Sequence, residues 1–174
     1  RRSGSFLFAE TDAVKVLELP YVGNELSMVL VLPKGKPEEF AQTLDLARLH
    51  EWQGMVARQE VDIYLPKFKF ETQYELKELL SDMGMVDAFE LPPADFSGIS
   101  GHKDLYITKV IHKAIIEVNE EGSEAAAATA VVVGTKAVMH KPVFKADHPF
   151  LFMIRHNETG SILFMGRVAN PTAK

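Results

Sequence analysis

The sequence predicts an α+β fold, and three observations indicate it. Strand-like apolar runs occur in groups, segments of helical spacing lie between the groups, and the two kinds of element do not alternate as regular βαβ units. The chain has 174 residues, of which 47% are hydrophobic and 25% charged, as in an ordinary globular protein. We therefore expect one domain, or a large part of one, with a buried core.

The first predicted elements form a hairpin. The segment "AVKVLELPY" (13–21) is strand-like and ends at Pro20, "VGNE" (22–25) consists of turn residues, and "LSMVLVLP" (26–33) is a second apolar run. Because the second run is almost entirely apolar, we expect it to be buried on both faces of a sheet.

A helix and a strand are predicted next. Pro37 suits a first helical position and apolar residues follow it at helical spacing, so we predict a helix from Pro37 to about Met55. After it, "EVDIYLPKFKF" (60–70) alternates in hydrophobicity, which predicts a strand with a kink at Pro66.

A second helix is predicted over "TQYELKELLSDMGM" (72–85), ended by Gly84. The composition of "LPPADFSGISGHKD" (91–104) predicts a loop. The apolar residues of the predicted helix are Leu76, Leu79, Leu80 and Met83.

The rest of the chain predicts extended structure. Segment 105–121 alternates as one long strand, and the tail 148–171 contains two apolar runs joined by "HNETG" (156–160), which is a hairpin signal. One face of the long strand would carry Ile107, Lys109, Ile111, Lys113 and Ile115.

Composition and motifs exclude several classes of function. The net charge is -5 and no cluster of basic and aromatic residues is present, so we expect no nucleic-acid partner. The absence of cysteine excludes disulfides and thiol nucleophiles, and no apolar run has the length of a membrane span. The six histidines lack metal-ligand spacing, so we expect no metal and no cofactor.

Hydrolase signals are also weak. Ser100 lies in "GISGH" within a predicted loop, and not in the strand-to-helix turn that a nucleophilic serine of this type needs. Glu120 and Glu121 are adjacent in a predicted strand and therefore point to opposite faces, so they cannot act on one bond. We expect no catalytic residue.

Segment 120–142, "EEGSEAAAATAVVVGTKAVMHKP", has an unusual composition. Its alanines favour a helix, whereas Thr129 and the valines 131–133 favour an extended chain. No large side chain anchors either conformation, so both are open to the segment.

This segment resembles the hinge and reactive-centre loop of the serpins. "EVNEEGSEAAAATAVVV" and "ADHPFLFMIRHNETGSILFMGRVANP" are similar to the family's hinge and C-terminal strands. "KVLELPYVGNELSMVLVLP", "LPKFKFETQYELKELLSDMGM", "DFSGIS" and "KVIHKAIIEVNEEG" resemble serpin segments in the family's order. The resemblance covers essentially the whole chain.

The resemblance implies that residues 1–174 are the C-terminal half of a single serpin domain, with mixed sheets, few helices and a reactive-centre loop at about 120–142. The N-terminal half of the same serpin would then be a partner of this chain. The start "RRSGSF", without an initiator methionine or signal peptide, is expected of an excised or processed chain.

The family's activity implies a serine protease inhibitor that acts as a suicide substrate. A protease attacks the loop and forms an acyl-enzyme, and the cut loop then inserts as a strand into a sheet in a large conformational change. Small side chains can enter between packed strands without the overpacking that large ones cause. The hinge residues that match are Gly122, Ser123, Glu124, Ala125, Ala126, Ala127, Ala128 and Thr129.

Counting from the hinge glycine, as serpins generally do, places the scissile bond between Lys136 and Ala137. A lysine there fits the acidic specificity pocket of trypsin-like serine proteases, which would be the target partner. Because loop lengths vary after the hinge, a neighbouring bond stays open. A solvated loop lysine is the simpler interpretation of the residue alone.

Two further residues are candidates for a role. His112 taken alone is a core histidine, but it matches a serpin histidine beside the insertion site and would control sheet opening. Asn157 begins the sequon Asn-Glu-Thr and is a candidate glycosylation site if the protein is secreted.

Other functions stay open on the sequence. A non-inhibitory serpin, such as a carrier or chaperone, would keep the fold without insertion, although bulky residues at the hinge would then be expected. Inhibition of a papain-like cysteine protease is a further alternative. A generic α+β binding module does not account for the hinge. We expect an extracellular location and no membrane partner, with the cytoplasm as the alternative.

Overall fold

The computed structural model describes residues 1–36, 40, 45–119 and 141–171. The predicted hinge and scissile bond therefore lie outside the described residues, as does the predicted helix start at Pro37. The described residues form two compact units, one of Arg1–Phe68 with Val118–Lys174 and one of Lys69–Glu117.

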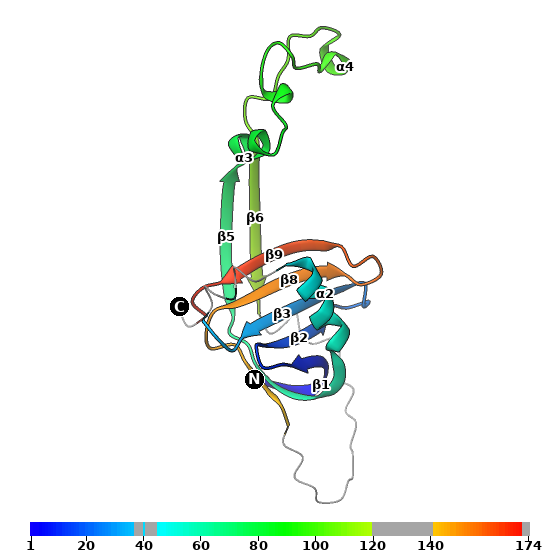
Figure 1. The fold of residues 1–174 in the computed structure, drawn as a ribbon, viewed down its shortest axis with the longest axis vertical. Helices are drawn as coiled ribbons and strands as arrows, with labels where there is room; N and C mark the ends of the chain where they lie inside the picture. The colour runs from blue at the N-terminus through cyan, green and yellow to red at the C-terminus, as the bar shows by residue number, and fades with distance from the viewer. Residues whose placement is uncertain (37–39, 41–44, 120–140, 172–174) are drawn as a thin grey trace, which may run out of the picture. The chain divides into compact units, whose positions relative to one another are not determined.

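The larger unit is built on a seven-stranded sheet in the order β7-β4-β1-β2-β3-β8-β9. Figure 1 shows the part of it that runs through β1, β2, β3, β8 and β9. All adjacent strands are antiparallel except β4 and β7, which are parallel. The strands are β1 (Arg2–Glu10), β2 (Val14–Pro20), β3 (Leu26–Pro33), β4 (Ala57–Tyr64), β7 (Val143–Lys145), β8 (Phe150–His156) and β9 (Ile162–Val168).

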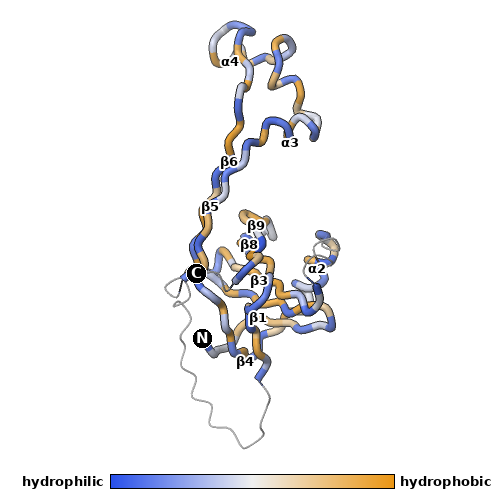
Figure 2. Tube along the Cα trace, turned by 90° about the vertical axis from the view of Figure 1, so that its left-hand side faces the viewer, coloured by the Kyte–Doolittle hydropathy of each residue, from blue (hydrophilic) through white to orange (hydrophobic). Residues whose placement is uncertain are grey.

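The central strands are buried on both faces of this sheet. Every residue of β3 after Leu26 is buried, which confirms the expectation for 26–33. On one face, the ladder aligns a continuous row of large side chains that ends at a glycine: Phe8, Leu17, Leu30, Phe152 and Gly166. The ring of Phe68 packs on this face against Phe150 and Phe152, with centroids 5.9 and 5.8 Å apart respectively. The hydropathy colouring in Figure 2 shows apolar stretches along these strands.

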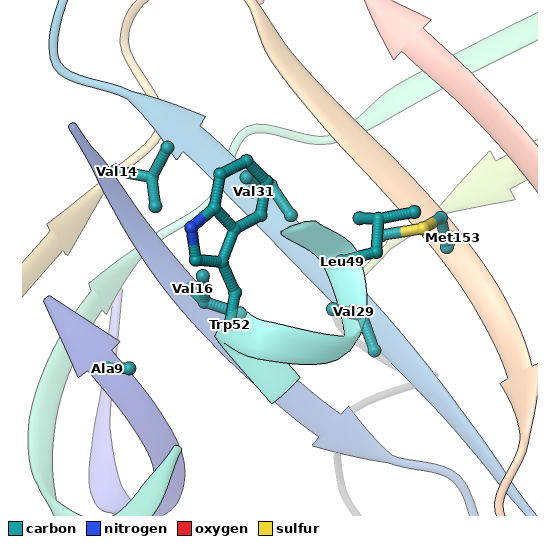
Figure 3. Packing of buried hydrophobic residues seen from close by; sticks show 8 residues of the cluster. All are labelled: Ala9, Val14, Val16, Val29, Val31, Leu49, Trp52 and Met153. Carbon is teal, nitrogen blue, oxygen red and sulfur yellow. The ribbon is translucent and has the colours of Figure 1, made fainter. Parts of the chain in front are cut away.

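The opposite face is covered by helix α2 (Leu46–Met55). Trp52 of the helix lies over Val14, Val16 and Val31, and Leu49 points towards Met153 (Figure 3). The predicted helix from Pro37 to about Met55 is not continuous, because Asp45 has extended φ and ψ of -137° and 170°. Asp45 is the N-cap of α2, and its carboxylate accepts a hydrogen bond from the backbone N–H of Arg48 at 2.8 Å.

Both predicted hairpins are confirmed. Strands β2 and β3 are joined by a turn in which Gly23 and Asn24 have φ of 85° and 58°, conformations that suit these two residue types. Strands β8 and β9 are joined through Gly160, with φ of 72°.

Strands β1 and β7 were not predicted. The first half of β1, "RSGS", has small and polar residues, and β7 has only three. Both are held by partners distant in sequence: β1 lies between β2 and β4, and β7 pairs with β4.

The predicted strand 60–70 is wrong as one element, because the chain breaks around Pro66. Strand β4 belongs to the large sheet, while β5 (Phe68–Glu75) pairs with β6 (Ile111–Val118) in a two-stranded sheet. The alternation itself was informative, since Val61 and Ile63 of β4 are both buried.

The smaller unit corrects three further predictions. Residues 72–75 extend strand β5, so the second helix, α3 (Lys77–Asp82), is shorter than predicted; Gly84, with φ of 101°, follows its end. The predicted strand 105–121 begins its ladder only at Ile111, because the N–H of Ile107 donates to Ala88 instead. The short helix α4 (Ser97–Ser100) lies within the predicted loop, and another short helix, η1 (Asp87–Phe89), precedes it.

Candidate functional site

The candidate site is the segment 120–140, and two strands from different sheets precede and follow it in the chain. Strand β6 ends at Val118 before this segment, and β7 begins at Val143 after it. The site residues predicted within the segment, from the hinge to Lys136 and Ala137, lie outside the described residues. The structure therefore describes how the chain is anchored before the segment and after it.

The anchor after the segment is held by backbone pairing. Strand β7 pairs in parallel with the end of β4, and the N–H of Asp62 donates to the carbonyl of Pro142 at 3.0 Å, which extends the pairing towards the loop. The Phe144 side chain is 0% exposed and fills the large-unit core. Burying such a side chain stabilises by about 1.5–3 kcal/mol, so the Phe144 ring adds to the backbone pairing that holds β7.

Side chains add two ties to the same anchor. The ammonium group of Lys15 on β2 donates to the carbonyl of Val143 at 2.8 Å. Lys141 lies 3.4 Å from the Glu60 carboxylate of β4 in an exposed ion pair. Exposed pairs of this kind contribute between 0 and about 1 kcal/mol, so the lysine bond to the backbone is the more specific tie.

The adjoining strand β4 carries a second charged contact. Ser3 and Arg1 both donate to Asp62, and these hydrogen bonds, that from Ser3 first, lower the pKa of the Asp62 carboxyl below its usual value. Arg1 lies 3.2 Å from the carboxylate. The Asp62 carboxylate on β4, next to the loop anchor, therefore stays ionised over most of the pH range.

The anchor before the segment is strand β6, which pairs with β5. Three ion pairs link β5 to β6 and to the residues just before β6: Lys69 with Glu117 at 2.6 Å, Glu71 with Lys113 at 2.6 Å, and Glu75 with Lys109 at 3.2 Å. The hydrogen bond between the first two raises the pKa of Lys69 and lowers that of Glu117. All three pairs are about half exposed or more, so they favour the register of the ribbon more than its stability.

His112 lies on β6, next to the exposed Ile111. In the described unit its side chain is exposed, so the structure does not place it in a core. Its role in sheet opening stays a prediction.

Asn157 lies in the turn between β8 and β9. Its side-chain nitrogen, the atom to which a glycan would be attached, donates to the carbonyl of Asn24 at 2.8 Å. Its side-chain oxygen is buried and has no partner among the described residues. The side chain therefore joins two turns of the large unit, a tie that attachment of a glycan would disturb.

No group of three or more histidine, cysteine, aspartate or glutamate side chains suited to a metal occurs among the described residues. No helix in the described part of the chain is long and apolar enough to cross a membrane. What the structure describes here is the strand that precedes residues 120–140 in the chain and the strand that follows them, β6 and β7.

Comparison with known proteins identifies the family of this chain. The family model for serpins, described as serine protease inhibitors, matches residues 1–171. The chain belongs to the serpin family, and its mostly β structure with few helices agrees with the expected α+β fold.

Similar proteins come from distant organisms. The chain is 48% identical over 163 residues to the leukocyte elastase inhibitor of Xenopus laevis, covering 90% of this chain and 43% of that protein. It is 45% identical over 168 residues to serpin B11 of Homo sapiens, covering 94% and 43%. It is 47% identical over 174 residues to an uncharacterised serpin-like protein of Thermococcus kodakarensis, covering 98% and 40%. The chain thus spans less than half the length of these relatives.

Proposed function

We propose that this chain is the C-terminal part of a serine protease inhibitor that acts as a suicide substrate, completed by the N-terminal half of the same serpin. The observation that carries the proposal is the hinge, in which all residues from 122 to 129 except Glu124 have small side chains, in a chain of the serpin family. The protein is then a target of proteases and not an enzyme.

The hinge composition supports insertion of the cut loop. Gly122 allows the change of φ and ψ that the loop needs at its turning point. In an inserted strand, alternate residues from Ser123 through Val131 share one face, and the side chains on it are small enough to enter a packed sheet. Each new backbone hydrogen bond contributes about 0.5–1.5 kcal/mol, so one added strand yields a substantial driving force.

Lys136 directs the inhibitor to trypsin-like proteases in this proposal. The cleaved bond joins Lys136 to Ala137, and the lysine ammonium enters the acidic specificity pocket of the protease. The acyl-enzyme forms on the Lys136 carbonyl, and insertion of the segment before it then distorts the attached protease.

The names of the relatives favour a second target class. Several of the similar proteins are leukocyte elastase inhibitors, among them those of Xenopus laevis and Homo sapiens. Elastase has a small specificity pocket, which would accept a small apolar residue such as Val133 or Ala137 instead of Lys136. The cleavage position in the trapped complex separates the two targets.

We propose the cytoplasmic alternative for the location. The similar proteins include a leukocyte elastase inhibitor and two serpin B proteins. None of these names supports the extracellular location expected at first. The engaged side-chain nitrogen of Asn157 also argues against use of the sequon. Fractionation of the source cells, with detection of the full-length protein and its glycan, tests this location.

Mixing the full-length protein with trypsin tests the inhibitor function. We expect a complex that survives denaturing electrophoresis, loss of this complex in Lys136→Ala, and no loss in Lys141→Ala, which removes a nearby lysine that pairs with Glu60. Parallel reactions with elastase and papain test the other target classes. Cleavage of the loop by every protease without any trapped complex would instead indicate the non-inhibitory carrier or chaperone.

A further inference from the structure

A hollow of about 220 Å³ lies in the large unit where β7 faces the ends of β2 and β3. Most of its exposed surface is apolar, and the residues that line it include three lysines, one histidine and one aspartate: Lys15, Leu32, Pro33, Lys34, Val143, Lys145, Asp147 and His148.

The basic groups outnumber the acidic groups that hold them. The Glu10 carboxylate lies 3.6 Å from the Lys15 ammonium and 2.8 Å from that of Lys34, so one carboxylate oxygen serves two lysines. The Asp147 carboxylate likewise lies 3.0 Å from Lys145 and 2.8 Å from His148. Two carboxylates thus face four basic groups.

His148 contacts one of these carboxylates and the end of β3. Its Nδ1 lies 2.8 Å from Asp147 and its Nε2 lies 2.7 Å from the Pro33 carbonyl.

The carboxylates stay ionised in this environment. Hydrogen bonds from His148 and then Lys145 lower the pKa of Asp147 to about 2, and the hydrogen bond from Lys34 lowers the pKa of Glu10. The lysines nevertheless keep capacity to bind an anion. Each ammonium has three N–H donors, and the contacts given above use two on Lys15 and one each on Lys34 and Lys145.

We propose that this hollow binds a tetrahedral oxyanion, a phosphate or sulfate group, between the ammonium groups of Lys15, Lys34 and Lys145. Charge-assisted hydrogen bonds would hold such an anion, and its negative charge would balance the positive charge that the two shared carboxylates leave uncompensated. The bound group would also join β7 to the ends of β2 and β3, and so reinforce the anchor that follows residue 140. This site is independent of protease inhibition.

Calorimetric titration of the full-length protein with sodium phosphate tests the site. Ionic strength is held constant with sodium chloride, and sodium sulfate is titrated in parallel. We expect saturable binding of both anions, weakened about tenfold by Lys34→Met and by Lys145→Met, which each remove a charge-assisted contact. Retention of binding in Lys34→Arg would show that the charge, and not a change in folding, decides the effect.

Lys103→Met is the matched control. Lys103 pairs with Asp95 in the smaller unit at 2.6 Å, and that carboxyl also has a pKa of about 2, so the variant removes an equivalent charge elsewhere. We expect it to bind phosphate unchanged. Titration with phosphoserine distinguishes the source of the anion: binding that Lys145→Met weakens assigns the site to phosphate esters as well as to free ions. Absence of saturation by all three anions, or equal weakening in Lys103→Met, would overturn the site.

Discussion

Gly166 of β9 lies directly opposite Phe152 of β8, and a Cβ atom at position 166 would lie 2.6 Å from the Phe152 ring. The glycine leaves space for the ring at the end of the apolar row that crosses the sheet. Gly166→Ala should therefore destabilise the full-length protein by about 1–3 kcal/mol through overpacking. The measurement is the midpoint of urea unfolding.

Gly54→Ala is the control for this substitution. Gly54 lies within helix α2, and a Cβ there would meet nothing within 4 Å. Alanine favours a helix by about 0.5–1 kcal/mol relative to glycine, so this variant should unfold at a higher urea concentration. If both variants unfold at the wild-type midpoint, the packing interpretation of Gly166 is wrong.

Arg155 of β8 and Glu18 of β2 form a largely buried ion pair across β3. Their side chains are 17% and 8% exposed, and the two atoms in contact are 3.0 Å apart. Arg155→Met leaves the Glu18 carboxylate buried without its cation, which should cost about 3–5 kcal/mol in the free energy of unfolding. Arg1→Met, which removes an exposed pair with Asp62, should cost at most about 1 kcal/mol. Equal losses of unfolding free energy in Arg155→Met and Arg1→Met would contradict the view that burial makes the Arg155–Glu18 pair the more important one.

The depressed pKa of Asp147 should appear in the acid stability of the protein. The pKa falls from the usual 3.8 to about 2 because His148, and then Lys145, donate to the carboxylate. The folded state therefore binds the proton more weakly than the unfolded chain, so this stabilisation is present above pH 3.8 and is lost as the pH falls through about 2. Asp147→Asn should make stability less dependent on pH over that window, as followed by thermal unfolding at several pH values. A variant with the wild-type slope would exclude this role.

Local sequence signals predicted the hairpins well, whereas long-range pairing was beyond them. The turns at Gly23 and Gly160 lie between runs whose hydrophobicity already defines strands, and these hairpins are confirmed. Residues 72–75 have helical spacing, but pairing with β6, far along the chain, makes them extended. Tertiary contacts of this kind override local propensity.

The candidate site was predictable only in part. The hinge is a local pattern, and its small residues can be recognised in the sequence alone. In contrast, the contacts between Lys15 and Val143 and between His148 and Pro33 join residues 128 and 115 positions apart. No periodicity in the sequence indicates which side chains meet over such separations, so the anchor and the basic hollow required the structure.

The hinge proposal makes a prediction for inhibition itself. Ala125→Arg would place a large charged side chain in the segment that enters the sheet, and overpacking should slow insertion. The full-length variant should be cleaved by trypsin as a substrate, with the stoichiometry of inhibition raised at least several-fold over wild type. Lys141→Arg, a change outside the hinge, serves as the control. A stoichiometry for Ala125→Arg equal to that of wild type would show that the segment does not insert.

Thermal unfolding of the full-length protein before and after cleavage in the loop tests the central claim most directly. The loop is cut once by catalytic amounts of a protease, and both forms are heated under the same conditions. If residues 122–133 add a strand to a sheet, the cleaved protein gains hydrogen bonds and buried area, and its midpoint should rise well above that of the intact protein. An unchanged or lower midpoint after complete cleavage would contradict insertion, and with it the proposed mechanism of inhibition.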